Sequence, residues 1–502
     1  MKKLIATYLC SIFISTQLLA QQQPITIPLD KKADISEIES MGDQGFLIKT
    51  SVGYAGREKN VQIHSFTNGL KKRWTVKLEK PTNTLLDYTL LASPYSAQTY
   101  YIQSSKVFTS SKGVLNITRI DSLGKKKDIV YKVSKEFSTS KRVAMFADED
   151  ALYILTAEET INKDNDIKKN KAKNKKESLL VFYLLKSDKT IMQRVETEIK
   201  LTSDSKDADL FVEYLGHDEE NIFLSRKSVD LPQNEIEYEV LTLDKNFATI
   251  DVTNFKATIE SPLVPALNMR VANGATIYNN DYDVTVTRSG NTVTTTYYAN
   301  AGSFGCAQLD AKTGIFYVYG LTAGKVSGKD AKKKSDKMLV NAQSGYVCKF
   351  DFNTGDLLDQ KEFALSKEFT NNTSFANPHL FTNRIIWLDV INDNMYKFCG
   401  FSGTEDIYAM VVPAKGEKME YIGKKVEFRK DGGSYHRRFI ANAFTSKLYT
   451  SDQQIKFMKN YPDFRAKDYS VFGIFLGDRT VIVRNSAYSK QPKLELNLFN
   501  HK

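Results

Sequence analysis

One serine of the chain has neighbours similar to those of a catalytic nucleophile. Residues 432–436 read GGSYH, which is similar to the Gly-x-Ser-x-Gly turn that exposes the serine of α/β-hydrolases. However, His436 stands where the second glycine is needed. The chain ends at residue 502, too soon for the sheet and helices that would supply the acid and the histidine of such an enzyme. The sequence therefore does not predict a serine hydrolase.

Histidines and cysteines offer no metal site by their spacing. No two of the five histidines stand at metal-ligand spacing, and no Cys-x-x-Cys occurs, so neither a metal nor another cofactor is predicted. His64 lies in an alternating stretch and is expected at the surface. Cys348 alternates with Tyr346 and Phe350, which predicts a free thiol on the buried face of a strand.

Acidic residues leave one catalytic alternative open. Residues 279–283, NNDYD, are similar to the start of a calcium loop but lack the glycine and terminal glutamate of an EF-hand. Glycoside cleavage needs two carboxyl groups that meet in space, and these can come from distant parts of a chain. Asp281, Asp283 and Asp389 are the candidates for such a glycan hydrolase or lyase.

Lysine is concentrated in two segments. Residues 163–177 contain seven lysines and three acids, and residues 324–337 contain six lysines and two acids. Such a concentration of charge attracts polyanions at low salt, although flexible solubilising loops have the same composition. The candidate binding residues are Lys168, Lys169, Lys171, Lys173, Lys175, Lys176, Lys329, Lys332, Lys333 and Lys334.

The elements that must position these residues read as a repeat of strands. Residues 350–365, FDFNTGDLLDQKEFAL, contain two alternating stretches around an Asn-Thr-Gly turn, which is typical of a hairpin. Similar hairpins follow other apolar strands of the chain, and residues 350–365 are the outer hairpin of the fifth unit. The apolar strands begin at about residues 45, 99, 151, 221, 314, 384 and 469.

Seven such units predict an all-β chain, a seven-bladed β-propeller. Blades packed between neighbours bury both faces of their inner strands, and residues 314–321, GIFYVYGL, have the continuous apolar character that this requires. Outer strands should alternate, as Trp74, Val76 and Leu78 do. Both lysine segments follow the apolar strand of their unit, so they should emerge on the same face of the disc.

Two further insertions interrupt the repeat. Residues 263–305 include an extra hairpin that turns at Ser289-Gly290-Asn291, and residues 440–462 predict a short helix. Each is either a peripheral decoration or a place where function was added. The wide spacing at 263–305 also leaves open a division into two domains.

The blade turns carry a resemblance to known proteins. Residues 309–314, LDAKTG, and 350–355, FDFNTG, resemble turns of the quinoprotein-like and related repeat β-propellers. The resemblance implies the architecture over about residues 25–500. It implies no cofactor, since only Trp74 and Trp387 exist and the tryptophan-docking pattern of quinoproteins is missing.

The beginning of the chain predicts export. Met1-Lys2-Lys3 precedes an uncharged apolar run from Leu4 to Leu19 and then Ala20, the composition of a secretory signal peptide over residues 1–20. The remaining residues, 21–502, form the predicted propeller, placed in the periplasm or at the outer surface of a bacterium.

These observations together predict a secreted binding or scaffolding module of the cell envelope. Its partner is expected to be an envelope protein or an anionic glycan. Nucleic acid is not expected, because export argues against it and neither lysine segment contains base-stacking aromatic residues. The oligomeric state stays open, and the glycan-active enzyme is the alternative.

Overall fold

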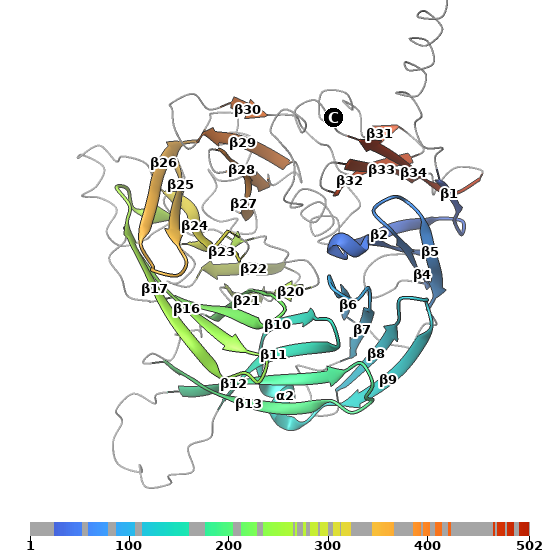
Figure 1. Cartoon of the computed structure of the whole chain (residues 1–502), viewed down its shortest axis with the longest axis horizontal. Helices are drawn as coiled ribbons and strands as arrows, with labels where there is room; N and C mark the ends of the chain where they lie inside the picture. The colour runs from blue at the N-terminus through green and yellow to red at the C-terminus, as the bar shows by residue number, and fades with distance from the viewer. Residues whose placement is uncertain are drawn as a thin grey trace, which may run out of the picture.

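Antiparallel strands dominate the structure and form small sheets arranged around a ring (Figure 1). The computed structural model describes residues 25–52, 59–78, 87–105, 113–159, 176–203, 212–227, 234–264, 267–268, 275–277, 282–289, 292–299, 305–311, 313–322, 344–365, 385–392, 395–401, 407–413, 420–422, 465–466, 469–476, 479–485 and 491–500.

Residues 33–258 form four sheets, each from four consecutive strands that pair antiparallel in chain order. Sheet 1 contains β2 (Ala33–Ser40), β3 (Phe46–Val52), β4 (Lys59–Phe66) and β5 (Lys72–Lys77). Sheet 2 contains β6 (Asp87–Ala92), β7 (Thr99–Ser105), β8 (Val114–Ile120) and β9 (Lys126–Lys132). Sheet 3 contains β10 (Lys141–Ala147), β11 (Ala151–Glu159), β12 (Lys176–Lys186) and β13 (Gln193–Ser203). Sheet 4 contains β14 (Val212–His217), β15 (Asn221–Lys227), β16 (Glu235–Asp244) and β17 (Thr249–Thr258).

The rest of the chain continues the ring. Sheet 5 contains β23 (Cys306–Asp310), β24 (Ile315–Thr322), β25 (Ser344–Asp351) and β26 (Leu357–Ala364). Sheet 6 contains β27 (Ile385–Asn392), β28 (Met395–Phe401), β29 (Ile407–Pro413) and β30 (Glu420–Ile422). Sheet 7 contains β31 (Arg465–Ala466), β32 (Tyr469–Leu476), β33 (Arg479–Asn485) and β34 (Lys493–Asn500).

This arrangement is the predicted β-propeller. The predicted apolar strands are β3, β7, β11, β15, β24, β27 and β32, and the outer hairpin of the fifth unit is β25–β26. The blade number of the whole chain stays a prediction, because residues 423–464, between sheets 6 and 7, lie outside the described part.

The two ends of the described chain meet in sheet 7. β1 (Ile25–Pro28) pairs antiparallel with β34, with Ile25 opposite Leu496. Ile27 is buried in a cluster that contains Leu494 and Val483 of sheet 7 and Phe46 of sheet 1. The first strand therefore completes the last sheet and closes the ring.

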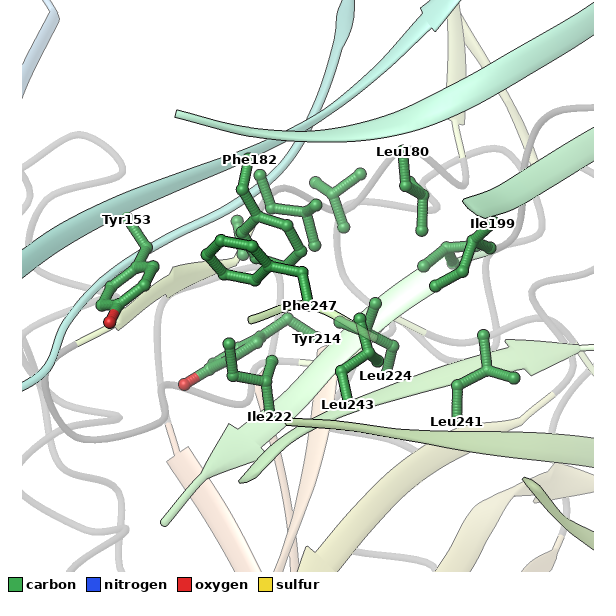
Figure 2. Packing of buried hydrophobic residues seen from close by; sticks show 14 of the residues in the cluster. Tyr153, Leu180, Phe182, Ile199, Tyr214, Ile222, Leu224, Leu241, Leu243 and Phe247 are labelled. Atoms are coloured by element: carbon green, nitrogen blue, oxygen red, sulfur yellow. The ribbon is translucent and has the colours of Figure 1, made fainter. Parts of the chain in front are cut away.

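Apolar side chains fill the space between neighbouring sheets. Figure 2 shows this between sheets 3 and 4, where Leu180 and Phe182 face Leu224 and Leu243. The rings of Phe182 and Phe247 stack with centroids 4.2 Å apart. Such packing explains why the inner strands read as continuous apolar runs, since both faces of each sheet are covered.

The outer hairpins of four sheets share one device that the sequence did not reveal. Each has a residue with positive φ, and this residue faces the preceding sheet of the ring. Leu70 and Phe247 bury their side chains there. At Gly124 the space is taken by Trp74, and at Gly355 by the carbonyl oxygen of Asn254. The residue type at this position therefore depends on the contacts with the neighbouring sheet as well as on the turn conformation.

Gly355→Ala is expected to lower the free energy of unfolding by about 2–4 kcal/mol. Its φ of +77° disfavours a side chain, and an added Cβ would lie 2.4 Å from the Asn254 oxygen. Gly69→Ala is the control, because a Cβ there has no neighbour closer than 3.8 Å. Chemical denaturation measures both, and equal losses would contradict the cross-sheet contact as the cause.

Sheet 6 departs from the strand order of the other sheets. Its apolar strand, β27, is the first of the four consecutive strands, whereas the apolar strand is second in the other sheets. The short β19 (Leu267–Asn268) pairs parallel with β27 from its inner side. β27 therefore still occupies the second place in space, which explains its apolar character.

The insertion at 263–305 forms the predicted hairpin but is not peripheral. β21 (Tyr282–Ser289) and β22 (Thr292–Ala299) pair up to Ser289 opposite Thr292. Before them, β18 (Leu263–Val264) pairs with sheet 5, β19 with sheet 6, and β20 (Ala275–Ile277) with β10 of sheet 3. Figure 1 shows β20, β21 and β22 in the middle of the ring.

Two short helical elements were not predicted. The 3-10 turn η1 (Gly42–Gln44) lies between β2 and β3, and α2 (Lys135–Thr139) lies between sheets 2 and 3. Ser134 caps α2 by accepting a hydrogen bond from the backbone N–H of Phe137 at 3.1 Å. Five residues are too few for a helical period to show in the sequence. The helix predicted in 440–462 lies outside the described residues.

Candidate functional site

The predicted lysine site is anchored by equivalent strands of two sheets. Residues 160–175 connect β11 to β12, and residues 323–343 connect β24 to β25. Both are connections from the apolar strand to the next strand outward, so their anchoring strand ends point to the same face of the ring. We call this the lysine face. Lys176 is the first residue of β12, and the other nine candidate lysines lie outside the described residues.

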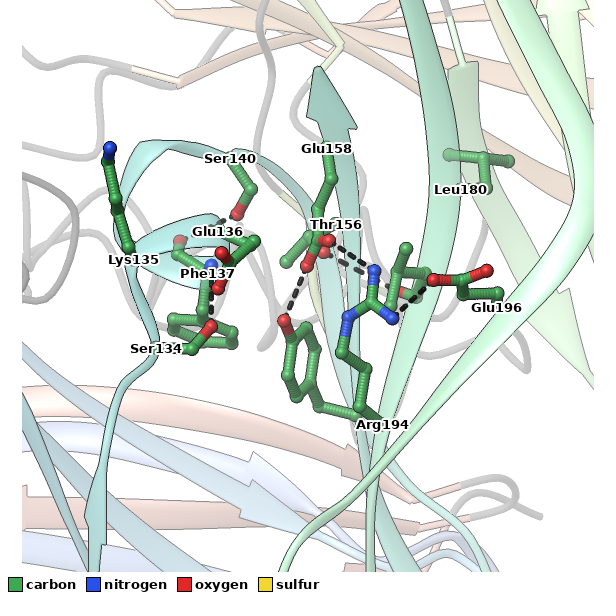
Figure 3. A network of polar contacts seen from close by, with 12 residues as sticks. Ser134, Lys135, Glu136, Phe137, Ser140, Thr156, Glu158, Leu180, Arg194 and Glu196 are labelled. Carbon is green, nitrogen blue, oxygen red and sulfur yellow. Dashed lines mark hydrogen bonds and ion pairs between the residues drawn. The ribbon is translucent and has the colours of Figure 1, made fainter. Parts of the chain in front are cut away.

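A buried carboxylate is held at the root of the first lysine segment (Figure 3). Glu158, near the end of β11, accepts a hydrogen bond from the Tyr183 hydroxyl and contacts Arg194 Nη2 at 2.6 Å. Arg194 also contacts Glu196 at 2.5 Å. Burial and the bond to Glu158 raise the pKa of Tyr183, so its phenol stays protonated. The root of this loop is therefore fixed by compensated charges.

The opposite face contains a polar cluster that sequence reasoning missed. Asp148 lies in the turn between β10 and β11, His217 ends β14, and Lys245 lies in the turn between β16 and β17. Lys245 Nζ contacts Asp148 Oδ2 and donates to the Asp218 carbonyl oxygen at 2.9 Å. His217 Nε2 lies 3.7 Å from Asp148 Oδ1.

Tyrosines complete this cluster. The Tyr214 hydroxyl bonds to His217 Nδ1, and Tyr95 of sheet 2 donates to the His217 carbonyl oxygen at 3.3 Å. Phe146 covers the imidazole with a centroid separation of 4.9 Å. Residues from sheets 2, 3 and 4 therefore meet at one histidine, and the cluster ties three sheets together.

His217 is neutral in the folded chain. Burial lowers its pKa to about 4, against the opposing effect of the Asp148 carboxylate. An Asp-His pair can act as a general base when its outer nitrogen reaches a substrate. Here only 3% of the side chain is exposed and Nε2 faces Asp148, so the geometry fits a structural bridge between sheets better.

A sequence signal for this cluster exists. Residues 146–155, FADEDALYIL, and 216–224, GHDEENIFL, place the same acidic turn before the apolar strand of sheets 3 and 4. In both turns the first aspartate donates its backbone N–H to the first residue of the strand. The repeat predicts equivalent turns, but not that Lys245 reaches across to Asp148.

The prediction that His64 lies at the surface was wrong. Its ring is buried on β4 and bonds to Thr50 Oγ1 at 3.3 Å and to Thr75 Oγ1 at 3.0 Å. Burial lowers its pKa to about 4. Two threonines on neighbouring strands satisfy both ring nitrogens, and this allows a histidine to occupy the buried position.

Of the other residues singled out in the sequence, some lie in the described part and one does not. Cys348 is buried on β25 as predicted, and burial raises the pKa of its thiol to about 12. Asp389 lies on β27 and Asp283 on β21, whereas Asp281 lies outside the described residues. Within the described ranges, no group of three or more acidic, histidine or cysteine side chains could hold a metal ion.

None of the helices in the described segments is long and apolar enough to cross a bilayer.

Comparison with known proteins identifies no family. No protein-family model matches, and no curated protein matches. A structure from a study of two prolyl endopeptidases aligns over 94% of this chain with 10% identity and a TM-score of 0.37. The chain spans about half, 50%, of the length of that protein.

Two other solved structures match over most of their own length. The β-propeller domain of the Trilobed protease from Pyrococcus furiosus aligns over 79% of this chain and 100% of that one, with 12% identity and a TM-score of 0.29. An uncharacterized protein from Listeria monocytogenes EGD-e aligns over 96% and 98%, with 8% identity and a TM-score of 0.35. At this similarity, the assignment of the fold rests on the sheets of the chain itself.

Proposed function

We propose that this chain is an exported β-propeller that holds an anionic component of the cell envelope on its lysine face. The component is either an acidic glycan or an acidic surface of another envelope protein. The propeller acts as a rigid disc that presents the two lysine segments together. No reaction is part of this function.

One observation carries the proposal: the two lysine segments join equivalent strands of sheets 3 and 5. Residues 160–175 contain six lysines and two aspartates, and residues 323–343 contain the same numbers. Each segment therefore has a formal charge of +4, against +11 for the whole chain. Together the two segments carry +8 of the formal +11, and the described strands that anchor them end at one face.

The opposite face supports a one-sided interaction. Its inner turns in sheets 3 and 4 carry Glu149, Asp150, Glu219 and Glu220 with exposed side chains. A polyanion is attracted by one face and repelled by this part of the other. The charge distribution thus favours binding in one orientation.

The proposal predicts salt-sensitive retention on an immobilised anionic polysaccharide such as dextran sulfate. Changing the ten candidate lysines to serine is expected to abolish retention at about 100 mM NaCl, because most of the positive charge of the lysine face is removed. A neutral dextran column should retain neither form. Elution positions in a salt gradient measure the difference.

A matched pair of variants locates the effect. Lys332, Lys333 and Lys334 form one lysine triplet, and Lys125, Lys126 and Lys127 form another at an outer hairpin on the opposite face. Changing the first triplet to serine should move elution to lower salt more than changing the second. Equal shifts would mean that only total charge matters, and the lysine face would then not be a binding site.

A pull-down from native envelope extract with the same variants identifies the natural partner.

A further inference from the structure

Two hairpin tips at the outer edge of the ring expose large aliphatic side chains. Leu123, at the tip between β8 and β9, is 86% exposed, and Ile191, between β12 and β13, is 80% exposed. No other large hydrophobic residue of the described part is as exposed. Single exposed aliphatic residues need no explanation, so the surroundings of these two decide whether they form a surface.

Hydrogen bonds and packing define the backbone of both tips. Asp121 Oδ1 accepts hydrogen bonds from the backbone N–H groups of Leu123 and Lys125, each at 2.9 Å. The adjacent Gly124 packs against Trp74 of sheet 1. In the second tip, Met192 is buried in the core, which leaves its neighbour Ile191 outside. The two side chains are therefore held in solvent by ordered backbone.

Arg119 joins the two tips across the seam between sheets 2 and 3. Its Nη1 donates to the carbonyl oxygens of Lys186 at 3.3 Å and Lys189 at 3.5 Å. Arg119 lies on β8, just before the Leu123 hairpin, and its two acceptors lie at the start of the connection that contains Ile191. Arg119 thus ties the second hairpin to the strand that leads into the first, and we call Leu123 and Ile191 together the tip pair.

The surroundings of the tip pair are basic. Exposed lysines follow Leu123 at positions 126 and 127, and Lys189 precedes Ile191. Of the acids beside the tips, Asp121 caps its own turn, Asp188 forms an ion pair with Lys189 at 2.7 Å, and Asp128 accepts a hydrogen bond from the Thr118 hydroxyl at 2.6 Å. Aliphatic side chains at a tip, flanked by lysines, are complementary to a bilayer surface. The aliphatic groups enter the boundary of the acyl chains, and the ammonium groups stay at the headgroups.

Other exposed aliphatic residues have the opposite surroundings. Ile250 of sheet 4 and Leu357 of sheet 5 are 59% and 44% exposed, yet Asp251 and Asp356 adjoin them in the chain. Carboxylates beside an aliphatic group oppose contact with an anionic bilayer. This pair therefore serves as a matched control within the same molecule.

We propose that the tip pair docks the edge of the propeller on a bilayer with anionic headgroups. The acidic inner turn with Glu149 and Asp150 adjoins the second tip, because the Asp150 carbonyl oxygen accepts a hydrogen bond from the backbone N–H of Ser187 at 2.6 Å. Docking therefore requires the disc to tilt onto its outer edge, so that Leu123 and Ile191, and not this acidic turn, meet the headgroups. The surface is separate from the lysine face and does not depend on its function.

Sedimentation with vesicles tests the proposal on the exported protein. At about 100 mM NaCl it should bind vesicles of phosphatidylcholine with about 30% phosphatidylglycerol, and bind pure phosphatidylcholine much less, since each lysine near the surface contributes. Changing Leu123 and Ile191 together to serine should reduce the partition coefficient by about tenfold per side chain. Changing Ile250 and Leu357 to serine should leave it unchanged.

Three results would overturn the proposal: no binding to anionic vesicles, equal losses in both double variants, or binding unaffected by the Leu123 and Ile191 changes. All four positions are exposed, so thermal melting should show that both double variants fold normally. The variant with ten serines on the lysine face should bind vesicles as the unmodified protein does. Loss of vesicle binding in that variant would assign the lipid contact to the lysine face instead.

Discussion

Replacing Lys245 with methionine is expected to lower the free energy of unfolding by about 3–5 kcal/mol. The ammonium group contacts Asp148 Oδ2 and also donates to the Asp218 carbonyl oxygen. Only 8% of the Asp148 side chain is exposed, so methionine leaves a buried carboxylate without its counter-ion. Chemical denaturation at neutral pH measures the loss.

Two further variants separate charge from packing. Adding Asp148→Asn to Lys245→Met should recover much of the stability, because the amide removes the buried charge and still accepts the hydrogen bond from the Glu149 N–H. Lys256→Met is the control on the same sheet: the Lys256 side chain in its ion pair with Glu237 is 69% exposed, and its removal should cost less than about 1 kcal/mol. If the double variant is no more stable than Lys245→Met alone, the buried charge is not the cause.

The pH dependence of stability should change in the same variant. In the unmodified protein the pKa of His217 is lowered to about 4, below the value of about 6.5 in the unfolded chain. Between these values only the unfolded state binds the proton, so the contribution of His217 to stability is complete above pH 6.5 and decreases as the pH falls towards 4, as does that of His64. Lys245 lowers the His217 pKa and Asp148 raises it. Lys245→Met should therefore raise the His217 pKa and make the decrease in the free energy of unfolding between pH 6.5 and 4 smaller. Lost packing alone would not produce this result.

The architecture was predictable because each blade repeats a local pattern. An apolar strand such as β24 and an alternating hairpin such as β25–β26 are encoded within about fifty residues, and both were located from the sequence. The Asp351 turn of that hairpin also follows local rules, because its Oδ1 accepts from the N–H groups of Asn353 and Thr354. Local chemistry fixes these elements.

Contacts between blades were not predictable in the same way. Asp148 and Lys245 are 97 residues apart, and nothing near either one indicates the other. Phe247 adopts a positive φ because its ring stacks on Phe182 of the preceding sheet, a reason that no turn rule contains. His64 depends on Thr50 and Thr75 of neighbouring strands. The lysine segments are different, because composition alone located them. The strand order then showed that the strand ends that anchor them lie on one face.

Deleting residues 25–28 is the change expected to disrupt the ring as a whole. Ile27 is buried, and removing such a side chain alone costs about 2–5 kcal/mol. Loss of all of β1 would also uncover Leu494 and Leu496 and leave the backbone of β34 as an unprotected edge. We expect a larger loss in the free energy of unfolding than Ile27→Ala causes, measured by denaturation. We also expect concentration-dependent association through the open edge, measured by size-exclusion chromatography.

A peptide should reverse this defect if strand pairing is its cause. A synthetic peptide of residues 21–32, QQQPITIPLDKK, contains β1 and can add to the edge of β34 in trans. The same peptide with Ile25→Asp and Ile27→Asp keeps the backbone donors but cannot enter the core between sheets 7 and 1. Restoration by the first peptide and not by the second would show that β1 closes the ring through both pairing and burial. A truncated chain as stable as the full one would mean that the ring holds without this strand, and that the contacts between sheets 7 and 1 suffice.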